Sequence, residues 1–146
     1  MARLIIGVIV GYALMFLLNI AGFLTLYAIM GADQAYEPGL YLASTKWIVA
    51  TFVMFFFTGA IAGLICAVIA RGGRSPLALA MVVVIAGLLL AVPAMLKARV
   101  NSKLVRTGDV PQMQAAQLSY WPSWCPFAIP FVSAIGVFVG GKVKRS

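Results

Sequence analysis

The sequence predicts an all-α membrane protein: an antiparallel bundle of four transmembrane helices, with a short interfacial helix before the last span. Hydrophobic residues make up 64% of the chain and charged residues 10%, whereas a soluble domain is about half apolar and about a quarter charged. Four apolar runs also reach the roughly 18 residues that a bilayer span requires. These runs are 4–30, 47–70, 77–96 and 124–141. We therefore expect residues 1–146 to form a single membrane domain.

The first run follows Arg3 and has to be distinguished from a signal peptide. A signal peptide has an apolar region of about 7–15 residues followed by an A-x-A-like cleavage site. Run 4–30 is longer and ends at Tyr27-Ala-Ile-Met-Gly31 without such a site. We therefore predict a retained helix, which at about 1.5 Å per residue measures roughly 40 Å and has to tilt or project beyond about 30 Å of hydrocarbon.

The positive charges predict an orientation. One side of the bundle receives Arg3, Arg71, Arg74, Lys142, Lys144 and Arg145, and the other receives Lys46, Lys97, Arg99, Lys103 and Arg106. The first group lies in short segments next to span ends, and Arg3 flanks the first helix, which usually dominates orientation. We expect a bacterial-type plasma (inner) membrane with both termini in the cytoplasm.

The net charge of +8 would suggest a nucleic-acid partner in a soluble protein. Here the lysines and arginines fall at helix ends, where they reach phosphate headgroups and set orientation. We therefore expect membrane lipids and a larger membrane-protein complex or a second copy of the chain as partners, and no nucleic acid.

Small residues predict where the helices pack. Helices in lipid approach closely only where small residues let their backbones touch. Three spans contain Gly-x-x-x-Gly, with the pairs Gly7 and Gly11, Gly59 and Gly63, and Gly136 and Gly140. All three pairs fall in the half near the termini, and Ala62, Cys66 and Ala70 extend a groove along the second span. The interpretation is a tight inner core; the alternative is that some pairs face lipid or a partner subunit.

Proline residues make the fourth span irregular, because Pro122, Pro126 and Pro130 are spaced four apart. Proline is tolerated in the first turn of a helix and is costly further in. We therefore expect the regular helix to begin near Pro126. The alternative is a deliberately broken helix that lines a cavity, as in some transporters.

The loop before the fourth span has helical spacing. Apolar and basic residues there fall on two different faces: Leu96, Val100 and Leu104 on one, and Arg99, Lys103 and Arg106 on the other. The spacing predicts that the third helix continues to about Arg106. A second short helix is expected to run to about Tyr120, with Asp109 as its N-cap and Pro111 just inside.

Reactive groups are scarce. The chain has no histidine, and its three carboxylates, Asp33, Glu37 and Asp109, all lie in predicted loops. Cys66 and Cys125 fall at opposite ends of the bundle, too far apart for a disulfide or a zinc site. We therefore expect no enzyme activity, no catalytic residue, no metal and no cofactor.

Two groups of polar residues are candidate contact sites. Asn19 is the strongly polar side chain within a span, and such groups usually form hydrogen bonds between helices; the alternative is a contact to a solute or pigment. Lys97, Arg99, Lys103 and Arg106 lie on the side that the topology makes external. They are expected to bind anionic headgroups or an acidic partner surface.

Function follows by elimination. The absence of catalytic groups and the presence of small-residue grooves favour a non-catalytic accessory or assembly subunit of a larger membrane complex. The alternative is a small transporter or channel that uses the proline-broken fourth helix and Asn19.

Overall fold

The computed structural model confirms the predicted all-helical membrane fold. It describes residues 1–71, 74–106 and 111–144. The elements are α1 (Ala2–Ala35), α2 (Thr45–Ala70), α3 (Ser75–Asn101), α4 (Gln112–Leu118) and α5 (Cys125–Val143). All except the short α4 are long and apolar enough to cross a membrane. Helices suit this composition because a backbone in lipid has to satisfy its own hydrogen bonds.

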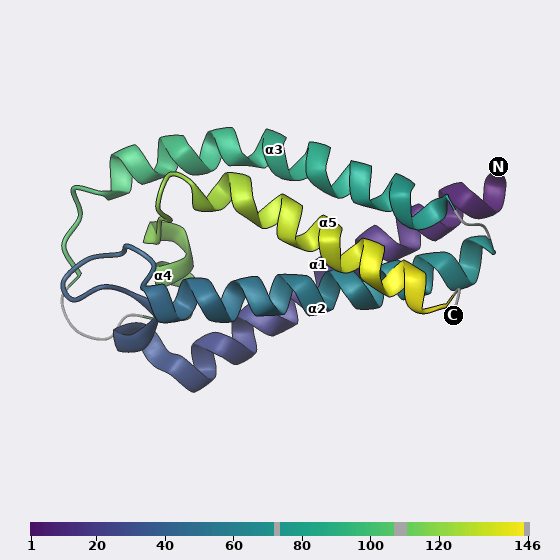
Figure 1. Ribbon diagram of the computed structural model, residues 1–146. Coiled ribbons are helices and arrows are strands. Elements are labelled where there is room, and N and C mark those ends of the chain that lie inside the picture. The colour runs from purple at the N-terminus through teal and green to yellow at the C-terminus, as the bar shows by residue number, and fades with distance from the viewer. Residues whose placement is uncertain (72–73, 107–110, 145–146) are drawn as a thin grey trace.

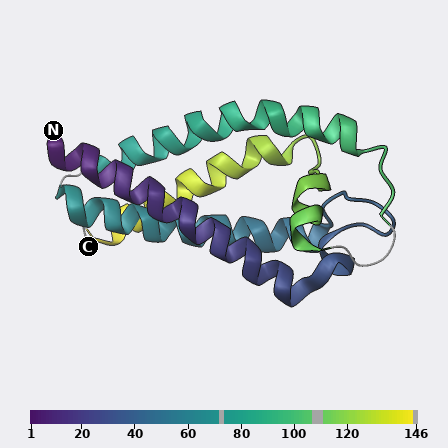
Figure 2. The ribbon, with the colours of Figure 1, turned by 180° about the vertical axis from the view of Figure 1, so that it is seen from behind.

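The four long helices run antiparallel along one another (Figure 1). Both termini lie at one end of the bundle, which we call the inner end. The chain between α1 and α2 and the short α4 lie at the opposite end, which we call the outer end (Figures 1 and 2). At this outer end α1 diverges from α3, and α4 lies between them (Figure 2).

The ends of the helices follow local sequence signals. Ser44 is the N-cap of α2, and its hydroxyl accepts a hydrogen bond of 3.2 Å from the Trp47 amide. Gly31 interrupts α1 with φ 69° and ψ 174°. Glycine adopts this backbone region without steric cost, so α1 can bend here before its last turn ends at Ala35.

Two expectations about the third span and the loop need correction. α3 ends at Asn101, so the predicted continuation to Arg106 is wrong. The chain turns away because the Arg106 amide donates a 2.8 Å hydrogen bond to the Gly39 carbonyl, which lies in the loop between α1 and α2. The short helix α4 is present, but Pro111 is its N-cap and does not lie just inside the helix as predicted. Asp109, the predicted cap, and Arg145 lie outside the described residues.

The fourth long helix begins where its first proline falls in the first turn, a position in which proline is tolerated. α5 starts at Cys125 and has Pro126 in its first turn, while Pro130 lies inside the helix. α3 likewise contains Pro93 in its interior, a proline that the sequence reasoning did not consider.

At the inner end, α2 and α5 approach until their backbones touch. A Cβ atom added to Gly59 would lie 2.5 Å from a carbonyl oxygen of α5, and the other three glycines of this pair of helices are tighter still. The facing carbonyls are those of Ser133 and Val137 for Gly59 and Gly63, and those of Phe56 and Ala60 for Gly136 and Gly140. Only glycine fits these positions without moving a backbone.

The first helix uses the other groove of α2. A Cβ on Gly7 would lie 3.1 Å from the Ala70 Cβ, and one on Gly11 would lie 3.2 Å from both the Ala62 carbonyl oxygen and the Cys66 Cβ. α2 therefore packs against α5 with one face and against α1 with another. The Cys66 thiol is buried here, and the Cys125 thiol is buried at the start of α5; both are free.

At the outer end, aromatic side chains and loop hydrogen bonds replace the glycine contacts. The Trp47 ring lies 6.1 Å from Phe23 and 6.3 Å from Tyr27, and Tyr36 lies 6.3 Å from Tyr41 (centroid distances). Burial raises the pKa of the Tyr36 phenol. The loop between α1 and α2 is joined to the segment before α5 by backbone hydrogen bonds to and from Tyr120, each 3.0 Å long.

Candidate functional site

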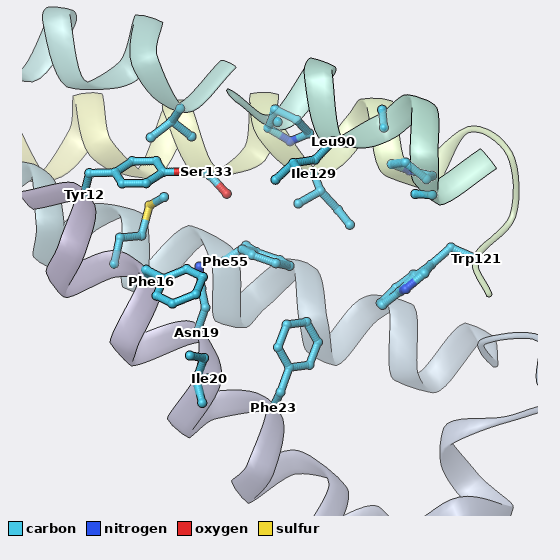
Figure 3. A pocket seen from close by; sticks show the side chains of 17 residues that line it. Tyr12, Phe16, Asn19, Ile20, Phe23, Phe55, Leu90, Trp121, Ile129 and Ser133 are labelled. Atoms are coloured by element: carbon cyan, nitrogen blue, oxygen red, sulfur yellow. The ribbon is translucent and has the colours of Figure 1, made fainter. Parts of the chain in front are cut away.

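A cavity of about 350 Å³ opens between α1, α3 and α5, about midway between the two ends of the bundle. Its walls are mostly apolar and aromatic (Figure 3). The lining includes Phe16, Phe23, Phe55, Leu90, Trp121 and Ile129. Phe16 and Leu90 are also 59% and 64% exposed on the bundle surface, so the cavity opens sideways between α1 and α3, toward the lipid.

Asn19 lies in this cavity and also connects two helices. Its Oδ1 accepts a 2.8 Å hydrogen bond from the Thr58 hydroxyl of α2. The Thr58 hydroxyl lies 3.2 Å from the Phe55 carbonyl as well. Figure 3 shows the Asn19 side chain pointing from α1 toward the centre of the bundle. The amide therefore stabilises the contact of α1 with α2 through one of its two polar groups, and its other group remains available.

Two hydroxyl groups accompany Asn19 at the inner part of the cavity. Tyr12 of α1 and Ser133 of α5 both line it (Figure 3). Ser133 is only 2% exposed. Among the described residues, neither hydroxyl has a hydrogen-bond partner, and the Asn19 NH2 group has none either. The structure also places Pro130 in this lining, so Asn19 and the proline-containing part of α5 share one cavity, although α5 continues as a helix through Pro130.

A second cavity of about 430 Å³ continues toward the outer end. It shares Ile20, Phe23, Ala94 and Trp121 with the first cavity. At its outer limit lie side chains of α3 and α4, among them Lys97. The two cavities therefore form one continuous groove along α1 and α3, which we call the α1–α3 crevice.

The four basic residues predicted to form one contact site divide into two pairs, while Lys46, the fifth basic residue of the outer end, is exposed at the start of α2. Lys97 and Arg106 are used inside the chain. The Lys97 ammonium donates a 2.7 Å hydrogen bond to the Ala116 carbonyl at the end of α4. The side chain of Arg106 is buried; it donates to the Leu40 carbonyl at 3.2 Å and pairs with the Asp33 carboxylate at 3.0 Å. Arg106 thus joins two outer loops and is not part of an exposed basic surface.

Arg99 and Lys103 remain exposed. Beside them is a groove of about 400 Å³ between the end of α3 and the segment that leads into α5. It is lined by Met95, Ala98, Arg99, Tyr120, Trp121 and Pro126. In the part of the chain that the structure describes, Arg106–Asp33 is the one salt bridge, so neither Arg99 nor Lys103 has a carboxylate partner there. We call Arg99, Lys103 and this groove the outer basic surface.

The described residues offer no group of three His, Cys, Asp or Glu side chains that could hold a metal ion. Asp33 pairs with Arg106, and the buried cysteines lie at opposite ends of the bundle. The chemistry of both candidate sites is therefore hydrogen bonding, apolar contact and positive charge.

Sequence reasoning found the polar residues of the cavity but not the cavity. Trp121 lines the crevice and the outer groove, a position that the sequence alone did not indicate. The signal that was available is Gly87, where an added Cβ would collide with the Pro130 ring. This contact sets α3 against α5 and leaves α1 apart from α3. Comparisons with known protein families, with curated proteins and with solved structures found no match.

Proposed function

We propose that the protein is a non-catalytic accessory or assembly subunit of a larger membrane complex. An acidic segment of the larger subunit docks on the outer basic surface. The observation that supports this proposal is the contrast among the outer cations. Arg106 and Lys97 are bonded within the chain, whereas Arg99 and Lys103 are exposed, and Arg99 lines an apolar groove.

Charge complementarity defines the partner. Arg99 and Lys103 have no carboxylate partner among the described residues, and the chain has an excess of eight positive charges. The groove beside them adds Tyr120 and Trp121, residue types that are enriched at protein interfaces because each combines a large apolar body with a polar group. An acidic segment with an apolar side chain satisfies both features.

The packing of α5 also favours a static role. Transporters of the alternating-access kind move helices against one another around a central site. Here α5 lies against α2 with four glycines in contact with facing carbonyl groups, so a shift along the interface brings side chains against backbone. This supports a rigid subunit over a moving one.

The test uses a photo-reactive amino acid in place of Ser102, which lines the groove. We expect ultraviolet light to link this position to a larger membrane protein, and mass spectrometry to place the link on an acidic segment. Changing Arg99→Gln with Lys103→Gln should lower the yield at least fivefold, and added salt should lower it as well, because exposed charges are screened.

The matched control removes the same charge from the inner end by Arg71→Gln with Arg74→Gln, two exposed residues. This pair should leave the crosslink yield unchanged. Equal yields from both double variants, or a chain that purifies alone without any protein crosslink, would contradict the docking proposal.

A second candidate function is a small transporter, and one observation favours it: Asn19 and Pro130 line the same cavity. The discriminating experiment is a liposome assay with the purified chain. If the chain alone moves a solute or protons, and the activity fails on Asn19→Ala or Pro130→Ala, the transporter replaces the accessory subunit as the function.

A further inference from the structure

The α1–α3 crevice contains three polar groups without a partner in the described structure, namely the Tyr12 and Ser133 hydroxyls and the Asn19 NH2 group. Tyr12, Asn19 and Ser133 come from α1 and α5 and line the same part of the cavity. Ser133 is 2% exposed and has no hydrogen-bond partner among the described residues. Tyr12 and Asn19 are half-buried. A polar group that faces an apolar cavity without a partner costs free energy, so the two hydroxyls and the Asn19 NH2 group point to an occupant that hydrogen-bonds with them.

Water alone does not account for the cavity. One water molecule takes up about 30 Å³ of liquid volume and needs two to four polar partners. The cavity measures about 350 Å³, and beyond those three side chains its lining is almost wholly apolar. The volume also falls in the range of roughly 300–1,000 Å³ that is typical of pockets for small molecules.

The crevice is elongated. Its lining on α1 runs from Tyr12 to Tyr27, which is roughly 22 Å at about 1.5 Å per residue. A flat ring that carries an apolar chain suits a groove of this length.

The lining defines the chemistry of the occupant. No charged side chain lines the first cavity, so an ionic group would be buried there without a partner. Aromatic side chains from α1, from α2 and from the segment before α5 line this cavity, among them Phe16, Phe55 and Trp121 (Figure 3). Aromatic walls favour a flat ring, which they contact by stacking or by edge-to-face packing.

From this arrangement we propose that the α1–α3 crevice binds an uncharged, membrane-soluble molecule with a carbonyl group on a flat ring, the chemical class of the membrane quinones. The ring lies in the first cavity, where the Tyr12 and Ser133 hydroxyls and the Asn19 amide donate to its carbonyl oxygen. The apolar chain of the ligand follows the second cavity, past Ala94, toward the outer end. Entry is sideways from the lipid, between Phe16 and Leu90.

The test uses Trp121 as the reporter, since this residue lines both cavities. Trp47→Phe and Trp124→Phe make it the single tryptophan, and decyl-benzoquinone is the probe. We expect saturable quenching of its fluorescence. Ala94→Phe fills the space shared by the two cavities and should abolish the quenching. The control is Val92→Phe on the same helix. Val92 is 59% exposed and faces lipid, so this variant should show the same quenching as the parent protein.

Recognition of the carbonyl is tested by conservative changes. Tyr12→Phe and Ser133→Ala each remove one hydroxyl that has no partner in the described structure, so the bundle should still fold. Each should weaken probe binding by roughly threefold to tenfold, the effect of one neutral hydrogen bond. Decylbenzene, which lacks the carbonyl group, should compete at least tenfold less well than the quinone.

Three results would overturn the inference. These are quenching that does not saturate, competition by decylbenzene equal to that of the quinone, and binding that is unchanged in the variant with both Tyr12→Phe and Ser133→Ala. The assay needs only the purified chain, so its outcome is independent of the docking partner.

Discussion

The inner and outer halves of the bundle are built on different principles. In the inner half, glycines let helix backbones touch, and added Cβ atoms would meet facing carbonyl groups. In the outer half, α1 diverges from α3 (Figure 2), and aromatic rings, loop hydrogen bonds and one ion pair hold the segments together. Cavities lie beside these contacts.

The difference shows how a short, apolar chain can combine stability with available binding groups. Close packing in the inner half relies on dispersion between backbones, which gains strength only when helices approach closely. Such packing leaves no space for a ligand. The middle of the bundle leaves the polar groups of the first cavity unused, and the outer end leaves Arg99 and Lys103 exposed; these groups are what a partner or ligand can contact. The closest backbone packing and the candidate binding groups therefore lie in different parts of the bundle.

The largest expected effect tests the inner half. Gly63→Ala places a Cβ against the Val137 carbonyl, so a backbone has to move. We expect the free energy of unfolding to fall by about 2–3 kcal/mol, the upper part of the range for overpacked sites. Unfolding in increasing dodecyl sulfate measures it.

Gly22→Ala is the matched control for that variant. An added Cβ there meets only the flexible end of the Met54 side chain, and alanine has a helix propensity better by up to about 1 kcal/mol. This control should be neutral or stabilising. If the two alanine variants unfold alike, the glycine contacts are not what holds the inner half together.

A smaller effect is expected from the ion pair of the outer half. Arg106→Gln removes the guanidinium that bonds the Leu40 carbonyl and Asp33, and should cost about 1.5–3 kcal/mol, the range for hydrogen bonds to a charged group. Asp33→Asn should cost less than about 1 kcal/mol, because the Asp33 side chain is 79% exposed.

Arg99→Gln serves as the comparison for Arg106→Gln, since Arg99 is exposed. Its effect on thermal unfolding should stay within about 0.5 kcal/mol. Equal losses from the two arginine variants would mean that Arg106 does not join the outer loops as the geometry indicates.

The smallest effect concerns the boundary between the halves, where the Thr58 hydroxyl donates to Asn19. A double-mutant cycle with Asn19→Leu and Thr58→Val should give a coupling of about 0.6 kcal/mol, and at most about 1.7 kcal/mol. A coupling indistinguishable from zero would remove this hydrogen bond from the account of how α1 packs on α2.

Apolar length and proline position predicted the four long helices and the start of α5, because both signals act within a few turns of the chain. The end of α3 was not predictable in the same way. Leu104 continues the helical spacing of one face of α3 and Arg106 that of another. Hydrogen bonds from Arg106 to Gly39 and Leu40, far away in the sequence, favour a turn instead. Tertiary bonding overrides a weak local preference in such loops.

The candidate sites show the same difference between local signals, which could be recognised in the sequence, and long-range packing, which could not. Asn19 could be identified because a strongly polar side chain is unusual in an apolar span. The α1–α3 crevice could not, since it depends on how far α1 and α3 separate. The four basic residues Lys97, Arg99, Lys103 and Arg106 were predicted to form one contact surface. Burial removes Arg106 from this surface, and a hydrogen bond to α4 holds Lys97. Periodicity places residues on a face but does not say which of them find partners.

Distances between α1 and α3 in a lipid nanodisc test the central contrast most directly. Spin labels on exposed residues define an inner pair, Ile9 with Met81, and an outer pair, Leu24 with Leu96, in a background without Cys66 and Cys125. Pulsed electron paramagnetic resonance should give a narrow distance distribution for the inner pair and a broader one for the outer pair. An inner distribution as broad as the outer one would contradict the division into a closed inner half and an open outer half.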